Sequence, residues 1–141
     1  MNKAIIKIKN LSKKYNNNIK VLNNLNLTFE EGKIYSIIGP SGSGKSTLLN
    51  ILSLIDRPTS GSLFINESKV NFNELINNDK IRARNIGIVY QDKNLLPDFT
   101  TLENIYLPSL AINNSLLDSV KNGKKLLNKM KLINRGNHFP S

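Results

Sequence analysis

The sequence predicts an α/β fold built around a glycine-rich loop that joins a buried strand to a helix. Residues 34–38 form a short apolar run, which is typical of a buried strand. Residues 47–55 are apolar around much of a helix, as expected for a helix packed against a sheet. The loop between these two runs consists of Gly39, Pro40, Ser41, Gly42, Ser43, Gly44, Lys45, Ser46 and Thr47.

This loop has the residue types that bind a polyphosphate. Several backbone N–H groups can approach one anion only where side chains are absent, as at Gly39, Gly42 and Gly44. Lys45 can reach the β- and γ-phosphates, Ser46 can offer its hydroxyl to Mg²⁺, and the following helix adds its positive dipole end. A Gly/Ser-rich turn that fits the pattern by chance is the alternative, but the flanking strand and helix patterns argue against it.

Further elements are predicted on both sides of the loop. Pro58 is expected to end the helix that follows the loop, because proline disfavours helical geometry in the residue before it. Thr100 or Thr101 can cap a short helix through Tyr106, with Glu103 adding favourable charge in its first turn. The remaining predictions are strands at residues 4–8, 19–22, 25–29, 62–65 and 86–90, a polar turn at 16–18, and a polar helix at 73–84.

Residues 115–130 predict an amphipathic helix, although Gly123 weakens its middle. We interpret its apolar side chains as core packing rather than as a binding face. These side chains are Leu116, Leu117, Val120, Leu126, Leu127 and Met130.

Composition limits the class of protein. A chain of 141 residues suffices for one domain with a hydrophobic core. It has no cysteine, which excludes disulfides and thiolate metal sites and fits a reducing cytoplasm. No secretory signal is expected, because the first residues alternate isoleucine with lysine, and no apolar run reaches the length of a membrane span.

A formal net charge of +10 raises the possibility of nucleic-acid binding. The lysines are scattered, and only residues 121–131 are locally dense in them. No aromatic side chains are interleaved with the lysines to stack on bases. We therefore expect no nucleic-acid partner.

Four features, in this order, resemble the amino-terminal part of an ABC transporter ATPase. They are Tyr15, the loop Gly39 to Thr47 as the Walker A motif, the sequence Arg-Pro-Thr-Ser-Gly at residues 57–61, and Gln91 as the Q-loop glutamine. The resemblance implies a P-loop NTPase fold of the ABC ATPase type. Its core would be a mostly parallel sheet, accompanied by an antiparallel β subdomain.

The resemblance also implies ATP and Mg²⁺ as ligands. Tyr15 would stack on adenine, with simple capping of a sheet edge as the alternative role. Gln91 would orient Mg²⁺ or water together with Ser46, and the alternative is an ordinary polar residue at a strand end.

Residues 90–105 have a finer resemblance, to the ATPases of lipoprotein-releasing exporters. ATPases of macrolide exporters and of cell-division complexes share parts of this stretch. The resemblance implies transmembrane permease subunits as partners through Gln91 to Asn104, and a second ATPase copy in a head-to-tail dimer. It also implies a peripheral location at the cytoplasmic face of the inner membrane.

The family's signature motif, Walker B aspartate, catalytic glutamate and switch histidine would all lie beyond Ser141. We therefore expect residues 1–141 to be part of an ABC nucleotide-binding domain, truncated at its C-terminal side and without a complete catalytic set. Asp56 follows an apolar run, as a Walker B aspartate would, but its position after the loop favours a helix-end residue. His138 lacks metal-ligand companions and is expected to be a solvent or packing residue.

Two other classes of protein remain as alternatives. A nucleotide-binding regulatory module would bind without hydrolysis. A small kinase or GTPase would also have a phosphate loop, but the chain lacks the Asn-Lys-x-Asp pattern that reads guanine.

Overall fold

The computed structural model describes residues 3–16, 19–91, 94–112 and 114–140. Residues 17 and 18 of the predicted polar turn therefore lie outside the described residues. The chain divides into two compact units, Met1–Arg82 and Ala83–Ser141, and each has its own internal packing.

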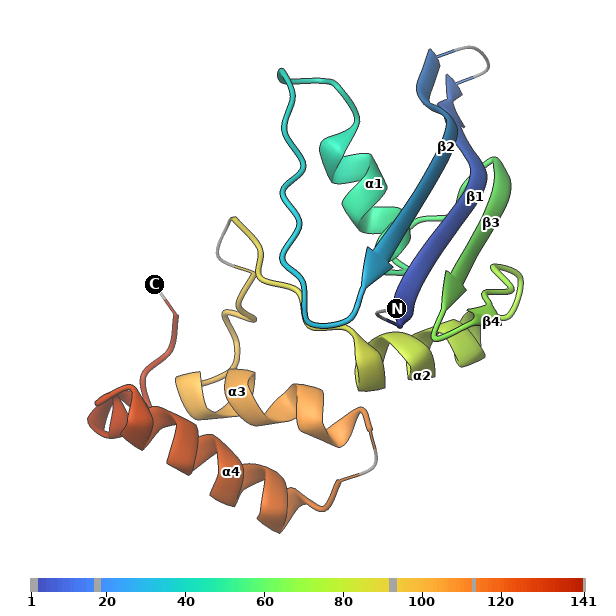
Figure 1. Cartoon of the computed structure of the whole chain (residues 1–141). Coiled ribbons are helices and arrows are strands. Elements are labelled where there is room, and N and C mark those ends of the chain that lie inside the picture. The colour runs from blue at the N-terminus through green and yellow to red at the C-terminus, as the bar shows by residue number, and fades with distance from the viewer. Residues whose placement is uncertain (1–2, 17–18, 92–93, 113, 141) are drawn as a thin grey trace. The chain divides into compact units, whose positions relative to one another are not determined.

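The first unit contains an antiparallel sheet with the strand order β2-β1-β3-β4 (Figure 1). Its first strand extends well past the predicted residues 4–8, and its second strand joins the two short strands predicted at 19–22 and 25–29. Both are long because each finds a hydrogen-bonding partner along most of its length. The strands are β1 (Ala4–Tyr15), β2 (Ile19–Glu30), β3 (Ser60–Ile65) and β4 (Ser68–Lys69).

The core of this unit lies between the sheet and helix α1 (Lys45–Leu52), which lies beside β2 in Figure 1. Ile8 and Leu63 are directly opposite each other on β1 and β3, and both are fully buried. Ile51 of α1 is also fully buried. The predicted helix therefore forms and packs against the sheet.

Helix α1 ends earlier than the sequence indicates. Its last residue is Leu52, and the chain then turns through Leu54, whose φ of 59° is left-handed. The backbone N–H groups of Ile55 and Asp56 both donate to the carbonyl of Asn50. The prediction that Pro58 ends the helix is wrong, because this left-handed turn ends it first.

The two predicted buried strands, residues 34–38 and 86–90, are not strands in the structure. In the first unit, Ile34 and Ile38 are 98% and 92% exposed; in the second unit, Val89 is 100% exposed. A parallel strand needs hydrogen-bonded neighbours, and within the described ranges neither segment has one. The described residues thus form the antiparallel part of the predicted sheet and not its parallel part.

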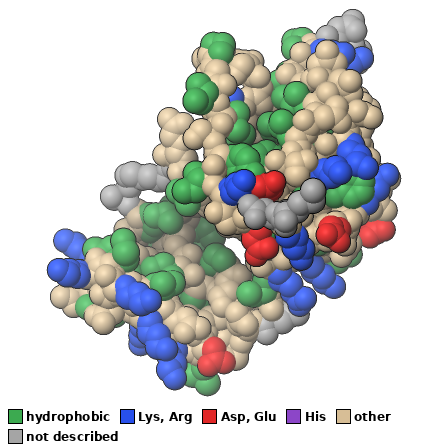
Figure 2. Space-filling view, in the orientation of Figure 1, with side chains coloured by type: hydrophobic (Ala, Val, Ile, Leu, Met, Phe, Trp, Pro, Cys, Tyr) green, Lys and Arg blue, Asp and Glu red, His purple; other side chains and the backbone are tan. Residues whose placement is uncertain are grey.

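These segments add to the apolar surface. Figure 1 shows residues 33–44 as a long loop (cyan) between β2 and α1. Figure 2 shows apolar side chains interspersed among polar ones over the visible face.

None of the helices in the described ranges combines the length and the apolar character that a membrane span requires.

The predicted polar helix at residues 73–84 is confirmed as α2 (Leu75–Asn85). In the second unit, α3 (Thr101–Leu110) begins as the sequence predicts. Thr100 is the N-cap, and its side chain and that of Glu103 form a reciprocal capping box. The helix continues past Tyr106 and includes Pro108.

The predicted helix at residues 115–130 is confirmed as α4 (Leu116–Lys129), but its buried face differs from the prediction. The buried side is formed by Ser119, Gly123 and Leu127, which are four residues apart. A Cβ atom on Gly123 would lie 3.0 Å from Leu102 Cδ1, so glycine permits the close approach of α3. A short 3-10 helix, η2 (Ile133–Arg135), follows α4.

The interpretation of the apolar side chains of α4 as core packing is wrong for four of them. Small residues occupy the contact with α3, so the larger apolar side chains point elsewhere. The exposed ones are Leu116, Leu117, Leu126 and Met130.

Candidate nucleotide-binding site

The phosphate loop has the backbone geometry that its glycines permit. Gly42 and Gly44 have φ values of 79° and 90°, in the left-handed region that other residues rarely adopt. Gly44 is also the N-cap of α1, and no side chain caps this helix end. The first N–H groups of α1 have no partner within the helix, so they are suited to bind an anion.

Gly44 also fixes the loop against the sheet. A Cβ atom at this position would lie 2.9 Å from Leu22 Cδ2 and 3.0 Å from the carbonyl oxygen of Val21. Any side chain here would push the loop away from β2. The start of α1 is therefore held against one end of the β1–β2 hairpin.

The ammonium of Lys45 lies over the loop. Its Nζ donates to the carbonyl oxygens of Gly39 at 2.9 Å and Pro40 at 2.7 Å. These two carbonyls belong to an exposed part of the loop. The lysine can therefore exchange them for phosphate oxygens by moving its side chain alone.

The loop also fits a magnesium ion that is bound mainly by phosphate oxygens. Ser46 lies in the first turn of α1 and is exposed, so its hydroxyl can reach such an ion. Over the described ranges, no group of three or more His, Cys, Asp or Glu side chains could hold a metal by itself. Mg²⁺ commonly uses one or two protein oxygens plus phosphates and water, and the Ser46 hydroxyl could be such a protein oxygen.

Tyr15 lies at the end of β1, where it pairs with Ile19 of β2. In the same hairpin Lys13 is opposite Leu22, the residue that a Cβ atom on Gly44 would meet. Tyr15 is two residues from Lys13, and two residues of a strand span about 7 Å. Tyr15 and the phosphate loop therefore lie at the same end of the hairpin. The structure therefore brings these two parts of the predicted site together.

The hydroxyl of Tyr15 donates to Asp56 Oδ2 at 2.6 Å. Asp56 lies in the turn after α1, and its Oδ1 accepts from Lys13 Nζ at 2.6 Å. Burial raises the pKa of the Asp56 carboxyl, but hydrogen bonds from Lys13, Tyr15 and the Arg57 N–H outweigh burial and hold the pKa below its usual value. This carboxylate is thus an acceptor for the tyrosine.

Sequence reasoning missed the role of Asp56. It was predicted as a helix-end residue, and it lies four residues past the last residue of α1. Its partner Tyr15 is 41 residues away along the chain, and no short-range pattern connects the two. A pairing between Lys13 and an acidic residue could be expected only once β1 and the turn are known to be neighbours.

The Arg-Pro-Thr-Ser-Gly segment explains how Asp56 reaches the hairpin. Gly61 has a φ of 93°, and a Cβ atom there would lie 2.5 Å from both the Asn10 carbonyl oxygen and Leu11 Cα. The Thr59 hydroxyl accepts from the Lys14 N–H at 2.9 Å. The segment therefore holds the turn against β1.

Gln91 belongs to the second unit, where it is exposed in a bend after residues 86–90. His138, in the same unit, is exposed, and its Nδ1 is 3.4 Å from Arg135 Nη1.

The ABC transporter family matches residues 22–140 of the chain. The chain belongs to the ABC transporter family. Among curated relatives, the LolD ATP-binding protein of the lipoprotein-releasing system of Wigglesworthia glossinidia brevipalpis is 41% identical over 99% of this chain and 62% of the relative. The corresponding protein of Rickettsia bellii is 39% identical with the same coverage. The chain thus spans about 62% of the length of these relatives.

Solved structures confirm the fold. The dimeric ABC transporter cassette MJ0796, a protein of Methanocaldococcus jannaschii, has a TM-score of 0.85 and 40% identity. That comparison covers 96% of this chain and 61% of the cassette. A post-hydrolysis state of the same cassette, bound to ADP and phosphate, has a TM-score of 0.80. The predicted P-loop NTPase fold of the ABC type is therefore correct.

The stretch that follows Gln91 in this ABC family member includes a loop organised by one side chain. Asn104 Nδ2 donates to the carbonyl oxygens of Leu96, Phe99 and Thr100 at 2.9 to 3.0 Å. Its Oδ1 accepts from the Leu96 N–H at 2.7 Å. The ordered loop exposes apolar side chains, with Leu95 52% and Leu96 50% exposed. Residues 92 and 93 of the predicted contact stretch lie outside the described residues.

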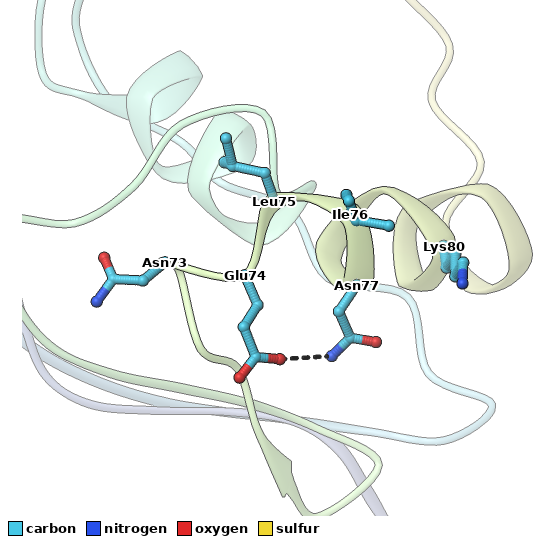
Figure 3. A pocket seen from close by; sticks show the side chains of 6 residues that line it. All are labelled: Asn73, Glu74, Leu75, Ile76, Asn77 and Lys80. Carbon is cyan, nitrogen blue, oxygen red and sulfur yellow. Dashed lines mark hydrogen bonds between the residues drawn. The ribbon is translucent and has the colours of Figure 1, made fainter.

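A hollow of about 540 Å³ lies at the start of α2, apart from the phosphate loop (Figure 3). Its residues include an internal hydrogen bond between Asn77 Nδ2 and Glu74 Oε2, at 3.3 Å. None of its lining residues comes from the predicted nucleotide site. They are Asn73, Glu74, Leu75, Ile76, Asn77 and Lys80.

Proposed function

We propose that this chain binds Mg-ATP at one end of the β1–β2 hairpin. The phosphates would lie in the loop at residues 39–47, and the adenine would stack on Tyr15. One observation supports this most strongly: a Cβ atom on Gly44 would meet Leu22, which is opposite Lys13, two residues before Tyr15. A phosphate-binding loop and an aromatic side chain at the same strand end suit the two ends of one nucleotide.

The chain's own residues would bind the phosphates in three ways. The glycines leave backbone N–H groups free to converge, and the start of α1 adds N–H groups that no side chain caps. Lys45 would exchange the Gly39 and Pro40 carbonyls for phosphate oxygens. Mg²⁺ would neutralise phosphate charge, and Ser46 and Gln91 are the residues proposed to orient it.

We propose that the whole protein is an ATPase that couples ATP binding and hydrolysis to transport. Phosphoryl transfer needs a positioned water and stabilisation of the transferred group, and the residues named here supply only binding and part of the charge stabilisation. The 141-residue chain is therefore proposed to bind ATP without appreciable turnover. The cassette MJ0796 is dimeric in its solved structure, which supports a pair of ATPase copies as the complete unit. We propose that the two copies pack head to tail.

Similarity to LolD proteins supports release of lipoproteins as the transport function, with ATPases of macrolide exporters and cell-division complexes as the alternative. In this proposal the protein is peripheral at the cytoplasmic face of the inner membrane. Its permease partners would contact the stretch from Gln91 to Asn104, where Leu95, Leu96 and Phe99 expose apolar surface.

Titration of the purified chain with ATP and with GTP, with and without Mg²⁺, tests nucleotide binding. The proposal predicts that Mg-ATP binds more tightly than Mg-GTP and that Lys45→Ala weakens both. Tyr15→Ala is expected to reduce the preference for ATP. Equal binding by wild type and Lys45→Ala would contradict the proposed phosphate site.

Co-purification with detergent-solubilised permease subunits tests the partner. The chain is expected to bind the permease of a lipoprotein-releasing exporter better than that of a macrolide exporter. Leu95→Asp with Phe99→Asp should abolish the interaction, because a charge would be placed in the apolar contact. Leu117→Asp is the matched control, since Leu117 is 84% exposed but lies on α4. Equal loss with the control would contradict docking at this loop.

A further inference from the structure

Three side chains around the proposed adenine platform form a connected group. Lys13 is 7% exposed, and its Nζ donates to Asp56 Oδ1 and to the Arg57 carbonyl oxygen, each at 2.6 Å. The same Nζ lies 4.7 Å from the centroid of the Tyr15 ring. Asp56 Oδ2 in turn accepts from the Tyr15 hydroxyl at 2.6 Å. One ammonium and one carboxylate thus contact the ring at its face and at its tip.

We propose that Lys13 and Asp56 are positioning residues that hold the Tyr15 ring in one orientation for adenine. The inference rests on the proposed function, because it concerns the orientation of the ring on which adenine is proposed to stack. Asp56 fixes the tip of the ring, and the Lys13 ammonium covers one face. The opposite face is the one left to stack on a base, and the residue is 39% exposed.

Orientation matters because stacking contributes only when the two planes overlap. A tyrosine at a strand end has two rotatable side-chain torsions, and binding would otherwise have to restrict both. A ring already held at its tip and on one face loses less freedom when the base arrives. The hydrogen bond and the cation contact therefore raise adenine affinity without touching adenine.

The same contacts also have a structural role, since a buried ammonium needs a partner. An ion pair between β1 and the turn requires only Lys13 and Asp56. The ion pair does not require the Tyr15 hydroxyl, whereas the positioning role does, because Asp56 holds the ring through that hydroxyl. The two roles therefore differ in what removal of that hydroxyl does to nucleotide affinity.

Tyr15→Phe is the central variant, because it keeps the stacking ring and removes only the hydroxyl that Asp56 holds. Affinities for ATP and for inorganic tripolyphosphate would be measured by calorimetry on the 141-residue chain. The proposal predicts a roughly three- to tenfold weaker ATP affinity and an unchanged tripolyphosphate affinity, because the ring keeps its stacking face but must be ordered when the base binds.

The double variant Lys13→Met with Asp56→Leu removes both charges together, so that no buried charge is left unpaired, and methionine is close to lysine in volume. It is expected to reproduce the loss of ATP affinity seen in Tyr15→Phe. In a Tyr15→Ala background the same double variant should have no further effect, because it acts through the ring. Asp79→Asn is the control, since it removes a carboxylate that pairs with Arg82 on α2.

The outcomes separate the two levels of the proposal. Wild-type ATP affinity in Tyr15→Phe would overturn the positioning role, as would an equal loss of tripolyphosphate binding in the double variant. A further loss of ATP affinity in the Tyr15→Ala background would overturn it as well. If wild type binds neither ligand, or if Lys45→Ala changes neither affinity, the proposed function itself fails and this inference falls with it. Circular dichroism of each variant confirms that the fold is retained.

Discussion

The two ends of the proposed nucleotide site obtain their geometry in different ways. The phosphate loop is local: its left-handed residues, Gly42 and Gly44, and its cation, Lys45, all lie within a few residues of one another. The base platform is not local, because Tyr15 is held by Asp56, 41 residues further along the chain. A local device can be recognised from adjacent residues, whereas a non-local one depends on which segments the fold brings together.

This difference also predicts how each end fails. Changes in the loop should weaken every phosphate ligand, whatever base it carries. Changes in the support of Tyr15 should weaken ligands that carry adenine and spare tripolyphosphate. The variants below test these expectations, from the largest expected effect to the smallest.

Gly61→Ala should have the largest effect on the support of the base platform. The new Cβ atom would lie 2.5 Å from backbone atoms of β1, and the φ of 93° adds strain, so we expect a loss of about 3 to 4 kcal/mol in the free energy of unfolding. Chemical denaturation measures this loss. Gly32→Ala is the control, because Gly32 has a φ of 73° and nothing within 4 Å of a new Cβ. A similar loss in both variants would contradict the close contact with β1.

Lys45→Ala should have the largest effect at the phosphate end. Loss of the ammonium removes charge-assisted hydrogen bonds to phosphate, so we expect about a hundredfold weaker binding of ATP and of tripolyphosphate alike. Calorimetric titration of both ligands gives the two ratios. Lys45→Arg keeps the positive charge but changes the shape of the cation. Its planar guanidinium should restore only part of the affinity. A loss confined to ATP would show that Lys45 does not contact phosphate.

Gly44→Ala and Gly42→Ala separate backbone strain from contact with the sheet. Both residues are left-handed, which costs alanine about 1 to 2 kcal/mol. Only at Gly44 would the new Cβ atom also press on β2, so this variant should lose about 1 kcal/mol more of its unfolding free energy. Thermal and chemical denaturation compare the two. Equal losses would contradict the docking of the loop against the hairpin.

Acid should have a smaller effect, through Asp56. The pKa of Asp56 in the folded chain is held below its value in the unfolded chain, so its stabilising contribution is present above that unfolded value. The contribution is lost as the pH falls through the lowered pKa. The melting temperature of wild type should therefore fall more steeply below about pH 4 than that of the Lys13→Met, Asp56→Leu variant. Parallel curves would argue against an ion pair at this position.

The parts of the structure that the sequence predicts well are those that depend on neighbouring residues. The phosphate loop and the start of α1 follow from contiguous glycines and Lys45. The start of α3 follows from Thr100 and Glu103, whose capping box needs only a spacing of three residues. Such features are visible without knowledge of the rest of the fold.

The predictions that are wrong depend on partners that the local pattern does not specify. Residues 34–38 have the apolar character of a buried strand, but within the described part of the chain no strand pairs with them. In α4 the buried contact uses Gly123, which the sequence indicates only as a weak point in a helix. Asp56 is similar, since its two partners lie on β1.

The most direct test of the central claim observes both ends of the site in one experiment. The chain has four tyrosines, so NMR spectra with ring-labelled tyrosine are simple to follow, and Tyr15→Phe assigns the Tyr15 signals. ATP is expected to shift the Tyr15 ring signals and the amide signals of residues 42–46. Tripolyphosphate is expected to shift only the amide signals. Tyr15 ring signals that stay unchanged at saturating ATP, while the amide signals shift, would contradict the claim that one nucleotide occupies both ends.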